Sequence, residues 1–161
     1  DRFKAFVRFH MSNTLNVFQG VQMNNAILIS ILPEYVASIL SGRKVFEYRR
    51  IMPAQAISHL VLYCTAPTKR VVAVVEVVGR LVGTPSEIWA DTSYGSGITH
   101  KFYTDYFAGQ KRAGAFALGN VYELSMPIKI SELTSCKVAP QSFCYLNSHD
   151  TNCILKSISV D

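Results

Sequence analysis

The stretch SGRKVFEYRR, residues 41–50, holds four basic residues and one acidic residue, and it decides how the flanking segments are interpreted. Glu47 and Arg49 stand two residues apart in an expected strand, so their side chains share one face. Phe46 and Tyr48 then point to the opposite face, where both rings are expected to enter the core. The stretch therefore predicts a strand with one apolar face and one charged face.

Lys44 has the strand parity of Phe46 and not that of Glu47. To join Glu47 and Arg49, it must lie in the turn before the strand, or a bulge must follow it. Gly42 makes such a turn easy, because glycine tolerates a left-handed backbone. We expect two cations and one carboxylate at the entrance of a strand, beside the end of a helix.

Three uses of this charge cluster are open from the residues alone. Lys44 and Arg49 can clamp a phosphate group. Glu47 and Arg49 can form a structural ion pair that steers the strand. A lysine with a lowered pKa can act as a catalytic base. The charge pattern ranks the structural use first, binding second and catalysis third.

Outside this stretch, short apolar runs bounded by glycine, proline and small polar residues predict strands. The expected strands are residues 26–31, 44–49, 59–64, 71–82, 113–118 and 121–124. We expect a bulge at Gly79 in the fourth of them, and a hairpin turn at Gly119 and Asn120 between the last two.

Three helices are expected among these strands, over residues 33–41, 85–89 and 99–107. Pro33 stands at a first helical position, and Gly42 stands where a left-handed C-terminal cap is favoured. Thr84 and Glu87 have the spacing of a capping box at the start of the second helix.

Strands outnumber crossover helices, which does not match a doubly wound parallel sheet. The order predicts an α+β fold, a small mixed and mostly antiparallel β-barrel with two to three flanking helices. Residues 26–146 are expected to form one domain. Residues 1–25 are expected to be an N-terminal extension or a segment left from cloning, and residues 147–161 a C-terminal tail.

Composition sets broad limits on partners and location. The chain of 161 residues is 49% hydrophobic, which is enough for one core. Its net charge of +5 permits an anionic partner without demanding one. The sequence has no apolar run of about 18 residues and no secretory signal pattern. We therefore expect a cytoplasmic protein with no membrane partner.

The four cysteines and four histidines lack the spacing of a metal site, so we expect no metal and no other cofactor. Cys64 lies in an apolar run and is expected to be a buried thiol. We expect no disulfide framework, because a chain of this length can build a normal core without one.

Basic residues recur in pairs along the chain. Besides the cations of the opening stretch, the pairs are Lys69 with Arg70 and Lys111 with Arg112. Several basic patches along one groove can bind the phosphates of a nucleic acid. The simpler interpretation is that these residues are solvated at the ends of loops.

Four other residues have side chains that could stack on a base or act in catalysis. Trp89 and Tyr103 have faces that can stack on bases, but their helical spacing favours core packing. His59 borders a strand and His100 begins a helix, and we expect both to be structural rather than catalytic.

The residues Gly42, Lys44, Glu47 and Arg49 match the pattern GxKxxExR, and the chain resembles the ASCH domain family of the PUA-like superfamily. The resemblance covers about residues 26–146. The flanking segments that carry it are residues 30–35, 63–67, 88–89, 96–99, 106–109 and 139–143. It implies a PUA-like barrel with a cleft beside the first helix, and binding of RNA or a nucleotide in that cleft.

From this resemblance and the charge pattern we expect the RNA or nucleotide to contact six residues, Lys44, Glu47, Arg49, Arg50, Lys69 and Arg70. One alternative is a hydrolase, either a nucleoside amidohydrolase or a ribonuclease, with Lys44 and Glu47 as catalytic groups. A second alternative is a regulatory protein-interaction domain.

Two residues depart from the pattern of related sequences. One branch of the family hydrolyses N4-acetylcytidine with a lysine and a threonine in this region. Glu47 replaces that threonine, which predicts poor activity of this kind. Leu32 stands where related sequences commonly carry a lysine, which removes a charge from the expected mouth of the cleft.

Overall fold

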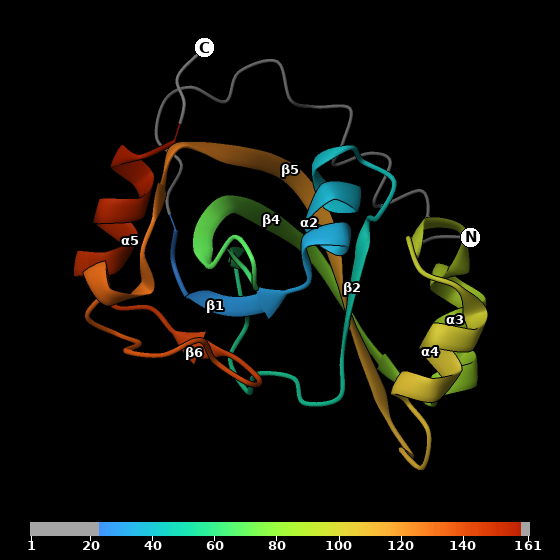
Figure 1. Ribbon diagram of the computed structural model, residues 1–161. Coiled ribbons are helices and arrows are strands. Elements are labelled where there is room, and N and C mark those ends of the chain that lie inside the picture. The colour runs from blue at the N-terminus through green and yellow to red at the C-terminus, as the bar shows by residue number, and fades with distance from the viewer. Residues whose placement is uncertain (1–22, 159–161) are drawn as a thin grey trace.

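The computed structural model describes residues 23–158, so the expected N-terminal extension lies almost wholly outside the described residues. These residues form one six-stranded sheet that curls into a half-barrel (Figure 1). Its strands, in spatial order, are β2 (Phe46–Arg49), β5 (Ala113–Ile128), β4 (Arg70–Gly83), β3 (His59–Cys64), β1 (Ala26–Ile31) and β6 (Cys144–Tyr145). β1 runs parallel to β3, and the other pairings are antiparallel. The predicted α+β fold with a mixed, mostly antiparallel barrel-like sheet is confirmed.

The helices pack against both faces of this sheet. The α-helices are α2 (Pro33–Leu40), α3 (Pro85–Thr92), α4 (His100–Tyr106) and α5 (Ser148–Lys156), and the short 3-10 helices are η1 (Ser93–Gly95) and η2 (Ile130–Glu132). Figure 1 shows α5 on one side of the curled sheet and α3 with α4 on the other. Within residues 23–158, no helix has the length and apolar content needed to cross a membrane.

The predicted helix ends are present. Pro33 opens α2, and Gly42 follows its C-terminal cap with a left-handed φ of 76°. Thr84 and Glu87 form the capping box of α3, with the Thr84 amide donating to Glu87 Oε2 at 2.9 Å. These ends depend only on residues within one helical turn, which is why the sequence is sufficient to predict them.

The two longest strands, β4 and β5, pair along most of their length and bend together in Figure 1. Their register shifts at three places, one of them between Val77 and Gly79, where a bulge is predicted. Bulges increase the local twist of a strand, so these shifts let a long two-stranded ribbon curl around the core.

The predicted hairpin at Gly119 and Asn120 is wrong, because β5 passes through both residues without turning. A Cβ atom on Gly119 would lie 2.6 Å from Val78 Cγ1, so glycine is needed for the close approach of β4. The Asn120 amide donates to Glu76 Oε2 at 3.2 Å instead of to a strand partner. The glycine and asparagine therefore make a bulge, because β4 supplies a partner on both sides of them.

The strand β1 is buried on both faces, as its continuous apolar run indicates. Ile27 and Ile29 face a core cluster that includes Ile39 of α2. Leu28 faces a second cluster that includes Ile154 of α5. Helices on both sides therefore cover the strand that leads into α2.

The segment treated as a C-terminal tail contains α5, a helix that the sequence analysis did not predict. Asn147 caps this helix by accepting from the Asp150 amide at 2.9 Å. Asp150 is fully buried, and its carboxylate accepts from the Thr134 amide and hydroxyl, both at 2.9 Å, and from the Ser135 amide at 2.6 Å. Burial opposes the charged form, but these hydrogen bonds outweigh it and lower the pKa of Asp150.

We expected no disulfide framework, but the structure has a disulfide between Cys136 and Cys144. The loop between them doubles back so that Cys144 pairs with Leu28 of β1. The expectation was based on the size of the core, which indicates whether a domain needs a cross-link for stability. Core size does not predict whether a loop brings two cysteines together. Cys64 is a buried free thiol, as predicted.

We predict that Asp150→Asn lowers the free energy of unfolding by about 2 kcal/mol at neutral pH, because an amide cannot accept from all the donors that surround the carboxylate. The folded-state pKa is lowered, so this stability is present above the ordinary pKa of 3.8 and is lost as the pH falls through the folded value. Urea unfolding across this pH range measures both effects. The exposed Asp91→Asn is the matched control, and equal losses in the two variants would contradict the prediction.

Candidate functional site

Lys44 lies in the turn between α2 and β2, so the strand begins two residues later than expected, and of the two placements that let Lys44 join Glu47 and Arg49 the turn is the one observed. Gly42 lets the chain leave the helix, and the Lys44 amide then donates to the Ser38 carbonyl at 3.0 Å. β2 begins only at Phe46, so the alternation of the strand does not govern where the Lys44 side chain points.

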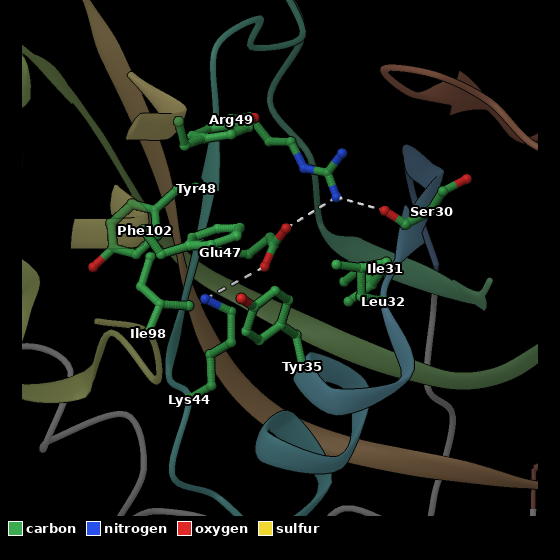
Figure 2. A pocket seen from close by; sticks show the side chains of 11 residues that line it. Ser30, Ile31, Leu32, Tyr35, Lys44, Glu47, Tyr48, Arg49, Ile98 and Phe102 are labelled. Carbon is green, nitrogen blue, oxygen red and sulfur yellow. Dashed lines mark hydrogen bonds and ion pairs between the residues drawn. The ribbon is translucent and has the colours of Figure 1, made fainter. Parts of the chain in front are cut away.

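Glu47 stands between the two cations of the site, and Figure 2 shows Lys44 and Arg49 approaching its two oxygens. Lys44 Nζ lies 3.7 Å from Glu47 Oε2, and Arg49 Nη2 lies 2.9 Å from Glu47 Oε1. The side chains of Lys44, Glu47 and Arg49 are 2%, 10% and 13% exposed. We call these three residues the charge cluster, which carries one net positive charge away from water.

Backbone carbonyls from three distant segments complete the shell around the cations. Lys44 Nζ donates to the Ser96 carbonyl at 2.8 Å. Arg49 donates through Nη2 to the Ser30 carbonyl at 3.1 Å and through Nη1 to the Ser142 carbonyl at 3.4 Å. These hydrogen bonds fix the position of the charge cluster. Among the described residues, the buried Nε–H of Arg49 has no acceptor.

Burial lowers the pKa of Lys44, although the carboxylate of Glu47 opposes this shift. The Lys44 ammonium also lies 5.0 Å from the ring centre of Tyr48 and 5.7 Å from that of Tyr35, which favours the charged form by a cation–π interaction. A lysine in this environment loses its proton more readily than an exposed lysine, so it is better suited to accept one.

A cavity of about 150 Å³ opens directly above the charge cluster. Its walls are mostly aromatic and apolar, and its charged and polar groups converge at one place (Figure 2). The lining residues are Ser30, Ile31, Leu32, Tyr35, Lys44, Glu47, Tyr48, Arg49, Ile98, Phe102 and Tyr106. Pockets for drug-sized ligands measure roughly 300–1,000 Å³, so this one has room for a single flat ring or a phosphate group.

The other basic residues of the predicted site lie at different distances from this cavity. Arg50 is exposed at its rim, where Nε donates to the Tyr106 carbonyl at 2.7 Å and the guanidinium lies 4.4 Å from the Tyr106 ring. Lys69 and Arg70 lie at the β3–β4 connection and do not line the cavity.

The aromatic and histidine candidates do not line this cavity. Tyr103 is buried in the core, as predicted, and Trp89 packs against the same cluster while stacking on His100 at 4.9 Å. His59 is buried on β3, which lowers its pKa, and it pairs across the sheet with Glu76.

The aromatic walls of the cavity were not predicted from the sequence. Phe102 and Tyr106 are four residues apart and share the face of α4 that borders the cavity, whereas Tyr103 and Phe107 point into the core. The spacing of the two pairs predicts that one pair faces the core and the other faces outward. It does not predict which pair faces the core.

Residues 29–127 match the family model described as the ASCH domain. This match covers more than half of the chain, and the protein belongs to the ASCH domain family. It is 30% identical over 128 residues to an ASCH domain-containing ribonuclease of Zymomonas mobilis, an alignment that covers 77% of this chain and 86% of that protein. It is also 28% identical over 126 residues to the large ribosomal subunit protein uL22 of Ureaplasma parvum, but it spans only 40% of that protein.

Solved structures support the same assignment. The crystal structure of the ASCH protein from Zymomonas mobilis has a TM-score of 0.76 and 28% identity, over 83% of this chain and 96% of that one. A mutant form of that protein has a TM-score of 0.78 and 27% identity, over 84% of this chain and all of that one.

We predict that Gly97→Ala destabilises the protein more than Gly109→Ala. Both glycines have a left-handed φ, 64° and 75°, so both substitutions add backbone strain. A Cβ on Gly97 would lie 2.5 Å from Lys44 Cβ, whereas Gly109 has open space around it. Overpacking should therefore add at least about 1 kcal/mol to the loss in Gly97→Ala, measured by urea unfolding. Equal losses would show that Lys44 is not held against Gly97.

Proposed function

We propose that this ASCH protein binds single-stranded RNA and holds one base in the cavity above Glu47. The observation that carries the proposal is the combination of aromatic walls with a buried cluster of net positive charge. Aromatic faces stack on any base, and positive charge attracts the phosphate chain. The name of the Zymomonas mobilis relative, a ribonuclease, supports RNA as the class of partner.

The size of the cavity favours a single strand over a duplex. In a duplex the bases are stacked and paired, and the deep groove of A-form RNA keeps their edges from side chains. A cavity of about 150 Å³ admits a base only after it has left the stack. The partner is therefore an unpaired strand, a loop or an end.

The surrounding cations then bind the backbone of the same strand. Arg50 is exposed beside Tyr106 at the rim, where it binds a phosphate next to the held nucleotide. Lys69 and Arg70 bind phosphates farther along the strand. They lie at the β3–β4 connection, whose first residue, Thr65, donates its amide to the Ile31 carbonyl at the end of β1. The protein works in the cytoplasm, where single-stranded RNA is plentiful.

We predict that Arg50→Ala weakens binding of a short labelled single-stranded RNA. Loss of one phosphate contact should flatten the dependence of log K on log salt concentration by about 0.7. Lys44→Met should weaken binding as well, because it leaves Glu47 with one cation and removes the net positive charge under the cavity. Fluorescence anisotropy at several salt concentrations measures both changes.

The matched control is Lys156→Ala, which removes an exposed cation at the end of α5. It should leave the affinity and the salt dependence close to those of the unaltered protein. Circular dichroism shows whether each variant is folded. If folded Arg50→Ala and Lys44→Met proteins bind as tightly as the control, RNA does not use this site.

A second candidate function is RNA cleavage, which is favoured by the lowered pKa of Lys44 beside Glu47. A neutral lysine can take the proton from a ribose 2′-hydroxyl. The 2′ oxygen then attacks the neighbouring phosphorus, the bond from phosphorus to the 5′ oxygen breaks, and the leaving oxygen takes a proton from water. Glu47 and Arg49 hold Lys44 and the phosphate in position for this step.

We predict that any such cleavage speeds up as the pH rises through the pKa of Lys44, which lies below its ordinary value of 10.5. The neutral form is the base, so the rate follows the deprotonated fraction. A pH–rate profile with gel analysis of the products tests this, and DNA of the same sequence is the control because it lacks the 2′-hydroxyl. Cleavage of DNA, or an unchanged profile in Lys44→Met, would exclude this mechanism. RNA binding without cleavage would leave a binding module, and loss of both would favour the protein-interaction hypothesis.

A further inference from the structure

A disulfide closes the loop that follows η2. We call residues 136–144 the cysteine loop, because Cys136 and Cys144 join its two ends. Cys136 is buried at 6% exposure, and Cys144 is half-buried. Residues 137–139 of the loop are exposed, with Val138 at 75%, and β6 at its end is only two residues long. The cross-link is therefore a principal constraint on the shape of this loop.

The cysteine loop contacts the charge cluster through its backbone. The Pro140 carbonyl accepts from Ser30 Oγ at 2.8 Å. The Ser142 carbonyl accepts from Arg49 Nη1 at 3.4 Å, and the carbonyl of the same Ser30 accepts from Arg49 Nη2 at 3.1 Å. Phe143 also packs against the core cluster under α2. Two of the acceptors that orient Arg49 thus lie in the loop or are tied to it.

We propose that the Cys136–Cys144 disulfide is a redox control on this site, which positions Arg49 when oxidised and releases it when reduced. The inference rests on the proposed RNA-binding function. A disulfide in a protein of the reducing cytoplasm is commonly transient or redox-sensing, which fits a cross-link that closes a surface loop rather than a core.

The chemical step is thiol–disulfide exchange with a dithiol. One thiolate of the dithiol attacks the more accessible Cys144 sulfur, and the bond between the two cysteine sulfurs breaks, leaving Cys136 as a thiolate that takes a proton. The second thiol of the dithiol, as its thiolate, then displaces Cys144, which also takes a proton. Two electrons and two protons pass to the protein, and the dithiol leaves as a disulfide. An oxidised dithiol reverses the reaction.

Reduction lowers RNA affinity by lowering the fraction of molecules in which the loop is in place. If the loop stays closed only about a tenth of the time, the apparent affinity falls about tenfold. The contacts made in the closed state are the same, so the salt dependence of binding stays unchanged. This separates loop release from a simple loss of a phosphate contact.

The test compares the affinity of the full chain for labelled single-stranded RNA before and after treatment with dithiothreitol, with two newly titratable thiols as proof of reduction. We expect weaker binding after reduction, recovery with oxidised dithiothreitol, and weak, dithiol-insensitive binding in the Cys136→Ser/Cys144→Ser double variant. The control Cys153→Ser removes the exposed free thiol of α5 and should keep the full response. Unchanged affinity of the reduced protein would overturn the proposal.

Hydrogen–deuterium exchange provides a readout that needs no RNA. Amides of residues 137–143 and of β2 should exchange faster after reduction. Equal exchange before and after reduction would contradict the proposal that the disulfide holds the cysteine loop against Arg49. If the oxidised protein does not bind RNA at all, the proposed function fails, and the exchange result still decides whether the disulfide holds Arg49.

Discussion

Glu47 holds two cations out of water, and this arrangement constrains the structure around it. A buried cation without a partner is costly, and a buried pair becomes costly when one member is removed. Lys44 must therefore arrive from the turn after α2, while Arg49 arrives from the end of β2, so that both reach the same carboxylate. The left-handed Gly42 and the close approach of Gly97 to Lys44 are backbone conditions of that meeting.

The remaining hydrogen-bond capacity of the cations binds together segments that are far apart in the chain. Ser30 belongs to β1, Ser96 follows η1, and Ser142 lies in the cysteine loop. Asp150 in turn ties α5 to Thr134 and Ser135, directly before that loop. The site is thus supported by elements from both ends of the described chain.

The same geometry accounts for the chemistry available at the site. The cavity is small and mostly apolar, so its few polar groups act where water is limited and their interactions are stronger. Burial makes Lys44 a better proton acceptor, while the guanidinium of Arg49 offers planar donors to an anion. A site of this kind can bind an anionic ligand, and it also contains a candidate base.

Features that depend on neighbouring residues could be predicted from the sequence. The shared face of Glu47 and Arg49 and the ends of α2 and α3 follow from local backbone geometry. Three other features could not be predicted in this way: Gly119 and Asn120 form a bulge, Cys136 meets Cys144, and Phe102 rather than Tyr103 faces the cavity. The tertiary structure also decided that Lys69 and Arg70 lie away from the cavity while the backbone of Ser142 reaches Arg49. The physical reason is that each of these outcomes depends on a partner from a distant segment, and folding of the whole chain is what brings that partner into contact.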